Sequence, residues 1–130
     1  MRDLLAANAE LIRPNGAVVT GPGNIANSHA RSFARFDATQ HLLSGQDAEI
    51  DGDGATVRAN LVAIHMWQGF PAGAGMLERS FTAGGVITGA MIRTPDGWRI
   101  ARMENRVVWR TGYSGDMRQF SYEEPDSPGS

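Results

Sequence analysis

The sequence predicts an α+β protein in which one short helix precedes a sheet of five or six long antiparallel strands. Two segments rich in strand-forming residues, Thr39–Ile50 and Ala55–Trp67, flank Asp51-Gly52-Asp53-Gly54, which is a strong turn signal. Residues 25–36 carry apolar side chains at helical spacing. Together these patterns indicate a helix followed by a long central hairpin.

The first part of the chain is expected to form the end of a helix and then a tight hairpin. Met1–Asn8 contains leucines and alanines, which favour helix. Glu10–Arg13 and Ala17–Thr20 flank Pro14-Asn15-Gly16, whose Asn-Gly pair is typical of a tight turn. We therefore expect a hairpin to precede the short helix.

The helix predicted at Ile25–Phe36 follows a Gly-Pro-Gly break, with Asn24 as a suitable N-cap. Beyond the central hairpin, a loop rich in Gly, Ala and Pro at Gly69–Gly75 leads to a strand predicted at Met76–Arg93. We expect this strand to be bulged or interrupted at Gly84-Gly85.

The last strand is predicted at Trp98–Arg110, after Thr94-Pro95-Asp96-Gly97, which has proline and glycine where a reverse turn requires them. The sequence becomes polar from Gly112 onward. We therefore expect one domain over residues 1–113 and a flexible tail over residues 114–130.

Composition excludes several functional classes. A chain of 130 residues fits one domain with its own core. The net charge of −2 predicts no binding to nucleic acid or to an anionic membrane. The absence of cysteine excludes thiol catalysis, and because all 12 basic residues are arginine, Schiff-base chemistry through lysine is excluded too. No apolar run has the length of a membrane span and no signal-peptide pattern is present, so we expect a cytoplasmic protein.

Two histidines are the candidate functional residues. Because His41 lies ten residues before the central turn and His65 eleven after it, we expect the imidazoles at similar heights on neighbouring strands. His65 belongs to an otherwise almost wholly apolar row of alternate residues. Either residue can alternatively be a hydrogen-bonded core histidine, and His29 is expected to be a packing or surface residue. The histidine spacing predicts no metal site.

Four segments together resemble the SnoaL-like branch of the nuclear transport factor 2 superfamily. They are Gly23–Phe36, the segment opening with Ala38-Thr39-Gln40-His41, Leu61–His65, and Arg93–Ile100 running on to Trp109-Arg110-Thr111-Gly112. The superfamily includes scytalone dehydratase, bile-acid dehydratase, steroid isomerases and polyketide cyclases. The resemblance implies a cone, formed by a strongly curved sheet, around a hydrophobic pocket.

The resemblance also implies a function. His41 matches the histidine of the dehydratases' Thr-Gln-His element, and His65 falls where those enzymes place a second histidine or an aspartate. This implies a cofactor-free lyase or isomerase acting on a small hydrophobic hydroxy-carbonyl or polycyclic substrate. One imidazole would remove an α-proton and a protonated partner would release the hydroxyl. The residues expected to contact the substrate are Phe33, Leu61, Trp67, Ile87, Met103 and Asn105.

Two further hypotheses follow from what the sequence lacks. Family members normally begin with one or two helices that close the cone and supply a tyrosine and an aspartate, and we expect these helices to be shortened or absent here. A non-catalytic module that binds a similar small hydrophobic molecule is therefore one alternative. The other is an assembly protein whose open sheet face pairs with another chain. Because an uncovered sheet face exposes a large apolar patch, we expect a homo-oligomer.

Overall fold

The computed structural model describes residues 2–69, 75 and 79–113. These residues form one six-stranded sheet in the order β2-β1-β6-β5-β4-β3, together with a 12-residue helix. The elements in chain order are a 3-10 helix Arg2–Leu4, β1 Leu5–Ile12, β2 Val18–Thr20, α1 Pro22–Phe33, β3 Phe36–Asp51, β4 Gly54–Trp67, β5 Ser80–Thr94 and β6 Gly97–Gly112.

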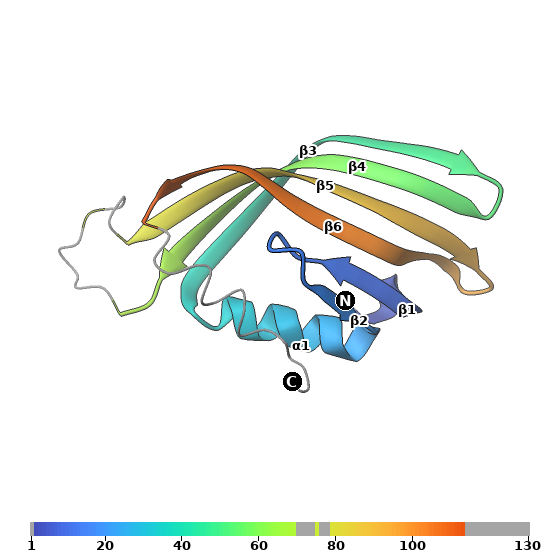
Figure 1. Ribbon diagram of the computed structural model, residues 1–130, viewed down its shortest axis with the longest axis horizontal. Helices are drawn as coiled ribbons and strands as arrows, with labels where there is room; N and C mark the ends of the chain where they lie inside the picture. Colours follow the sequence, from blue (N-terminus) through green and yellow to red (C-terminus); the bar gives the residue numbers. More distant parts are fainter. Residues whose placement is uncertain (1, 70–74, 76–78, 114–130) are drawn as a thin grey trace.

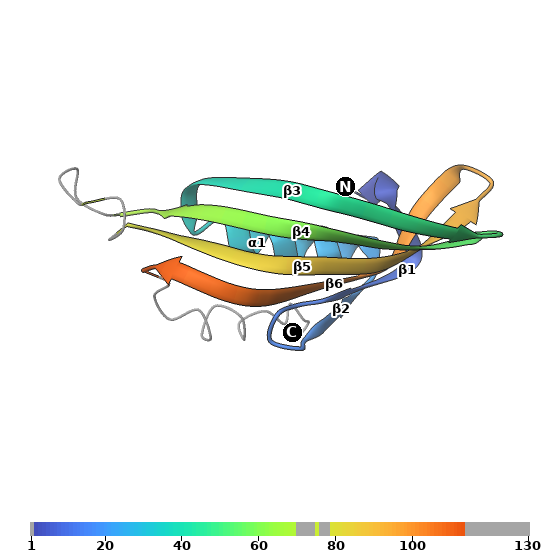
Figure 2. The same cartoon turned by 90° about the horizontal axis from the view of Figure 1, so that it is seen from above.

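The four long strands β3 to β6 form a curved layer, and α1 and the β1–β2 hairpin lie against its concave side (Figure 1). The view from above shows α1 crossing behind these strands (Figure 2). The predicted α+β class, with a strongly curved sheet and one short helix, is confirmed. The sheet is mixed rather than wholly antiparallel, because β1 runs parallel to β6.

The central hairpin forms as the sequence predicts. Strands β3 and β4 pair from Phe36↔Trp67 to Asp51↔Gly54, and Gly52 in the turn has φ of +64°, a conformation that favours glycine. The register shifts between Ser44 and Asp47, so β3 contains a bulge halfway along. From this bulge to the end of β4 at Trp67, every second residue of β4 faces the concave side of the sheet.

Strands β5 and β6 meet at the predicted turn, where the Thr94 hydroxyl donates to the Gly97 carbonyl at 2.7 Å. The sheet is irregular at Gly84-Gly85, as expected, but the extra residue lies in the partner strand. Gly84 pairs with Trp109 and Gly85 with Val107, so the residue between these two partners is the bulge. Strand β5 itself continues through the two glycines.

The prediction of a helix end at Met1–Asn8 is wrong. Only Arg2–Leu4 is helical, as a 3-10 turn, and β1 begins at Leu5. This segment pairs with β6, because Leu5 lies opposite Ile100 in the parallel ladder. Pairing and burial in the sheet outweigh the weak helix preference of its leucines and alanines.

The helix is present but begins and ends about one turn earlier than predicted. It runs from Pro22 to Phe33, and Gly21, with φ of +94°, occupies the N-cap position. Asn24 is therefore not the N-cap. Its side-chain amide lies within the first turn and donates to the Thr20 carbonyl at 3.0 Å. Pro22 at the first helical position fits this start, because its missing N–H is not needed there.

Two small cores hold the layers together. The first packs the β1–β2 hairpin and α1 beneath the sheet, and the second closes the end of the sheet near β3. The first consists of Ala6, Ala9, Leu11, Val19 and Ile25. The second consists of Trp67, Phe81 and Ala83, with Phe36 and Val107 packed against them.

Some predicted features lie outside the described residues. These are most of the loop at Gly69–Gly75, the first part of the strand predicted from Met76, and the tail over residues 114–130. Within the described part of the chain, no helix has the length and hydropathy that a membrane span requires.

Candidate functional site

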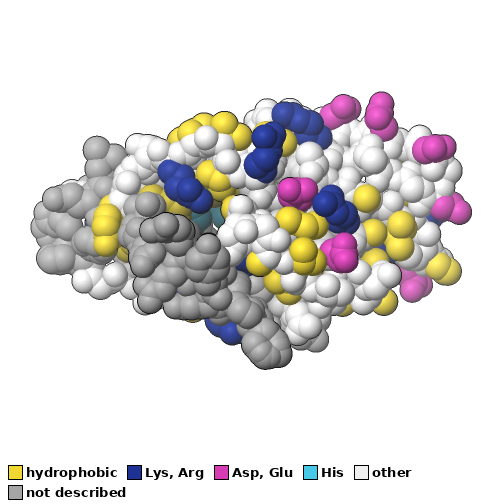
Figure 3. All heavy atoms as spheres, in the orientation of Figure 1, with side chains coloured by type: hydrophobic (Ala, Val, Ile, Leu, Met, Phe, Trp, Pro, Cys, Tyr) yellow, Lys and Arg dark blue, Asp and Glu magenta, His cyan; other side chains and the backbone are white. Residues whose placement is uncertain are grey.

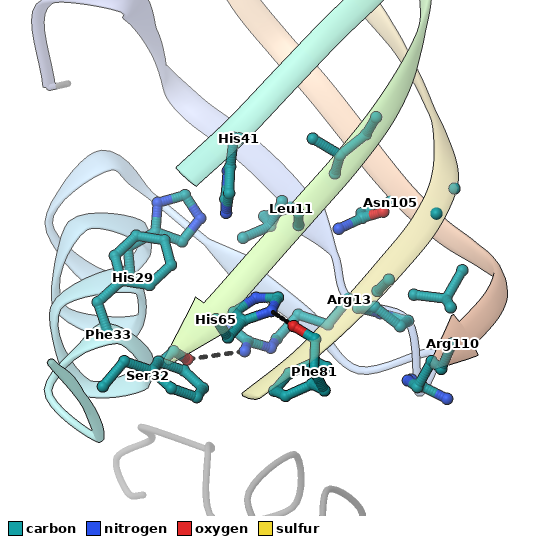
Figure 4. A pocket seen from close by; sticks show the side chains of 18 of the residues that line it. Leu11, Arg13, His29, Ser32, Phe33, His41, His65, Phe81, Asn105 and Arg110 are labelled. Carbon is teal, nitrogen blue, oxygen red and sulfur yellow. Dashed lines mark hydrogen bonds between the residues drawn. The ribbon is translucent and has the colours of Figure 1, made fainter. Parts of the chain in front are cut away.

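A cavity of about 190 Å³ lies between α1, the end of β1 and the concave side of the sheet. The close-up view shows side chains from all these elements converging on it (Figure 4). Its lining is mainly apolar, with imidazole, guanidinium, hydroxyl and amide groups interspersed. The lining residues are Leu11, Ile12, Arg13, Pro14, His29, Ser32, Phe33, Arg35, Phe36, His41, Leu61, Ala63, His65, Phe81, Ala83, Gly84, Gly85, Asn105, Val107 and Arg110.

All three histidines of the chain line this cavity. His41 lies opposite Ala63 and His65 opposite Thr39, so the two histidines are diagonal neighbours on β3 and β4. Their ring centroids are 6.1 Å apart, with an angle of 65° between the ring planes. The sequence-based expectation that these rings lie at similar heights on neighbouring strands agrees with this geometry.

His29 is the third imidazole, and it comes from α1. It was expected to be a packing or surface residue; it is half-buried and lines the cavity. The Phe33 ring lies between His29 and His41. The centroid of the Phe33 ring is 5.7 Å from that of His29 and 5.7 Å from that of His41. The available signal was the helical spacing of His29 and Phe33, which places both on one face of α1.

The surroundings of His65 determine which of its nitrogens can act. Its Nδ1 lies 3.3 Å from the carbonyl oxygen of Phe81, the residue opposite it on β5. A carbonyl only accepts hydrogen bonds, so Nδ1 carries the proton and Nε2 keeps a lone pair. The ring stacks on Phe81 with centroids 4.0 Å apart and planes 9° apart, and Phe36 lies 5.0 Å away.

Burial makes all three imidazoles weak bases. It lowers the pKa of His65 from 6.5 to about 4; nearby His41 lowers it further, while the hydrogen bond to Phe81 opposes both effects. Burial also lowers the pKa of His41, although this residue as a whole is exposed. The pKa of His29 is lowered by burial and then by the positive charges of Arg13 and His41. At neutral pH the site therefore holds uncharged imidazoles.

The charged groups in the lining are all cationic. Arg13 extends from the end of β1 to α1, where its guanidinium donates to the hydroxyls of Ser28 and Ser32, the latter at 2.9 Å. Arg35 and Arg110 also line the cavity, and among the described residues no aspartate or glutamate lines it. Figure 3 shows a small area of histidine surface recessed among hydrophobic side chains, while acidic side chains gather at the other end of the molecule.

The Asn105 side chain also lines the cavity, from β6. Its Oδ1 is buried and has no hydrogen-bond partner among the described residues. Buried polar atoms are rarely left without a partner in folded proteins. This oxygen is therefore available to accept a hydrogen bond from a bound molecule. The described residues contain no group of three or more His, Cys, Asp or Glu side chains that could hold a metal ion.

Residues 1–104 match the family described as the SnoaL-like domain. The chain belongs to this family. A comparison with curated proteins found no match. Several solved structures have the same fold as this SnoaL-like chain, at identities that support the fold alone.

The protein Kfla4162 from Kribbella flavida is 22% identical over 92% of this chain and 80% of its own, with a TM-score of 0.76. A protein from Novosphingobium aromaticivorans, provisionally assigned as a scytalone dehydratase, is 18% identical over 88% of this chain and 72% of its own, with a TM-score of 0.73. The hexachlorocyclohexane dehydrochlorinase LinA-type3 from Novosphingobium barchaimii is 14% identical over 88% of this chain and 75% of its own, with a TM-score of 0.69.

The SnoaL-like pocket contains only some of the residues that sequence analysis expected to contact a substrate. Phe33, Leu61 and Asn105 line it. Trp67 lies outside the lining, where its indole N–H donates to the Tyr113 carbonyl at 2.7 Å. Two further residues on the concave face lie away from this cavity. Ile87 borders a separate shallow hollow beside the β3 bulge, and Met103 packs against the first core.

Proposed function

We propose that this SnoaL-like protein is a cofactor-free lyase or isomerase that acts on a small hydrophobic hydroxy-carbonyl or polycyclic molecule, with His41 and His65 as its catalytic residues. The main support is that the two imidazoles come from adjacent strands, lie 6.1 Å apart and share one largely apolar cavity. The dehydratase and dehydrochlorinase names of its structural neighbours support an elimination reaction.

The proposed reaction is a syn elimination of water. Nε2 of His65 accepts the α-proton of the substrate, and the electrons of that C–H bond form the new double bond as the β-hydroxyl leaves. Burial makes the His65 imidazolium acidic, so it returns this proton to the departing hydroxyl, which leaves as water. The neutral His41 ring holds the hydroxyl by a hydrogen bond. Protons balance, and no cofactor is required.

The lowered pKa values modify the scheme expected from the sequence. A protonated partner at rest is disfavoured, because burial lowers the pKa of both His41 and His65. In this proposal the acid is instead formed during the reaction, by the proton that His65 has just accepted. The buried Oδ1 of Asn105 supports a substrate that carries a hydroxyl, since a hydroxyl can donate to it.

The test uses 3-hydroxy-1-tetralone, a cyclic β-hydroxy ketone whose dehydration yields fluorescent 1-naphthol. His65→Gln should lower the rate about 100-fold or more, the usual contribution of a positioned acid or base. His41→Ala, which removes the hydrogen bond to the leaving hydroxyl, should also lower the rate. Gln40→Ala is the matched control, because Gln40 is next to His41 but faces the opposite side of the sheet. Equal rates in all variants, or in protein-free buffer, would contradict the proposal.

The lining also favours a second candidate, a module that binds such a molecule without converting it. Within the part of the chain that the structure describes, the cavity offers neutral bases but no carboxylic acid and no imidazole that is protonated at neutral pH. Saturable binding of 3-hydroxy-1-tetralone that quenches tryptophan fluorescence, with no 1-naphthol formed over hours, would favour this candidate over the enzyme.

We also propose that the protein is a homo-oligomer. Large apolar side chains of the long strands remain exposed in the single chain, among them Leu42 at 49%, Ile50 at 67% and Val108 at 61%. A second copy would cover part of this surface. Sedimentation equilibrium at micromolar concentration should give a mass above that of one chain. A stable monomer there would contradict this proposal.

A further inference from the structure

The bulge in β6 decides which side chain faces the cavity at the end of that strand. Val107 lies opposite Gly85 and Trp109 opposite Gly84, so Val108 is the additional residue. The next residue, Arg110, lies opposite Ala83. Ala83, Gly85 and Val107 all line the cavity, so Arg110 returns to the cavity side of the sheet while Trp109 points to the outer side.

The neighbouring strand is shaped to accept this arrangement. The Trp109 indole lies over Gly84, at the position that a Cβ atom of any other residue would occupy. Only glycine leaves room there for the ring. In an unbulged strand, the alternation of side chains would instead turn Trp109 inward and Arg110 outward. The Gly84–Trp109 contact and the bulge therefore keep the guanidinium on the cavity side.

The position of Arg110 suits the binding of an anion. It is exposed, lines the cavity, and makes no hydrogen bond or ion pair within residues 2–69, 75 and 79–113. Figure 4 places it at the β6 side of the cavity, away from His29 and Phe33. The carboxylate of Asp37, at the start of β3, is not among the lining groups.

We propose that Arg110 binds an anionic group, such as a carboxylate, on a ligand whose apolar body occupies the cavity. A guanidinium presents parallel N–H donors that match the two oxygens of a carboxylate or sulfonate. The cationic lining contributed by Arg13 and Arg35 favours the same charge. This inference deepens the proposed function by naming the charge of the substrate, and it rests on that function only in assuming that the same cavity binds the substrate.

Two fluorescent probes of nearly the same shape test the proposal. 1-Anilinonaphthalene-8-sulfonate carries a sulfonate, and N-phenyl-1-naphthylamine is the same body without it. Arg110→Gln should weaken binding of the sulfonate about tenfold or more and leave binding of the neutral amine nearly unchanged, because only the charged hydrogen bonds are lost. Arg110→Lys should restore part of the sulfonate affinity, since it keeps the charge without the planar pair of donors.

Arg106→Gln is the matched control, because it removes the same charge from an exposed residue on the other face of β6. It should leave the affinities of both probes unchanged. The ring resonances of His41 and His65 in NMR spectra should shift with both probes, which places them in the cavity. The proposal would be overturned if Arg110→Gln weakened the binding of both probes equally, or if Arg106→Gln weakened sulfonate binding as much as Arg110→Gln does. It would also be overturned if the sulfonate left the His41 and His65 resonances unshifted.

The binding result is separate from turnover. If wild type fails to convert 3-hydroxy-1-tetralone but Arg110→Gln still weakens only the sulfonate, the proposed reaction fails and the anion site stands. If the neutral ketone is converted and the two probes respond alike to Arg110→Gln, the reaction stands and the anion site fails.

Discussion

The low pKa of His65 should make the stability of the protein depend on pH in a defined range. In the folded state burial lowers this pKa to about 4, while an unfolded chain restores the ordinary value of 6.5. Between these values the unfolded state binds more protons than the folded state, so falling pH favours unfolding. The contribution of His65 is complete above about pH 6.5 and is lost as the pH falls toward about 4.

The magnitude follows from the same two values. A difference between 6.5 and about 4 corresponds at most to about 3–4 kcal/mol, at about 1.4 kcal/mol per pKa unit. Solvent reaches part of the half-buried ring, which reduces the effect. We therefore expect the free energy of unfolding to fall by about 1–2 kcal/mol more in wild type than in His65→Gln between about pH 7 and about pH 4.5.

The assay is urea unfolding of wild type and His65→Gln, followed by tryptophan fluorescence at several pH values. Comparing the two proteins removes the contributions of the carboxylates and the other histidines, which both proteins share. An NMR titration of the His65 ring gives the midpoint directly. Parallel stability curves for the two proteins, or a His65 midpoint near its ordinary value, would refute the assignment of a buried neutral imidazole.

Three further predictions concern packing, a buried hydrogen bond and the rate of the proposed reaction. Gly84→Val should lower the free energy of unfolding by about 2–3 kcal/mol, because the new side chain overlaps the Trp109 indole. Thermal unfolding measures this loss. The double variant Gly84→Val/Trp109→Ala should lose less stability than the sum of the two single variants. Ser28→Ala removes a buried acceptor from Arg13 and should cost about 1–3 kcal/mol in urea unfolding; an unchanged midpoint would refute it. The dehydration rate should fall as the pH approaches about 4, because protonated His65 can no longer accept the α-proton; a rate that rises on acidification would contradict the proposed base.

Local sequence patterns were enough to predict the long strands. The Asp51-Gly52-Asp53-Gly54 turn fixes the β3–β4 register next to the turn, and the one-residue shift between Ser44 and Asp47, which the sequence did not reveal, then places His41 and His65 on the same face of the sheet. The resemblance to the SnoaL-like family agreed with this layout and is confirmed by the family match. What these residues do in the cavity stays a prediction.

The errors come from contacts between segments far apart in the sequence. The segment at Met1–Asn8 was expected to be helical, but Ala6 is buried where β1 packs under the sheet, which no local pattern reveals. His29 was expected to be a packing or surface residue, because helical spacing alone does not show that this face of α1 lines a cavity. Strict alternation along β6 would place Trp109 on the cavity side, but the single extra residue in this strand reverses the facing of Trp109 and Arg110.

The parallel pairing of β1 with β6 has a consequence for how the protein folds. Leu5 meets Ile100 and Glu10 meets Arg102, so the partners are separated by about 90 residues of chain. The β3–β5 strands can pair with close neighbours early, but the β1–β2 hairpin, which carries Arg13, cannot join the long strands until β6 has been synthesised. We therefore expect nascent chains that end before β6 to leave the β1–β2 hairpin undocked, so that the cavity is the last feature of the molecule to form.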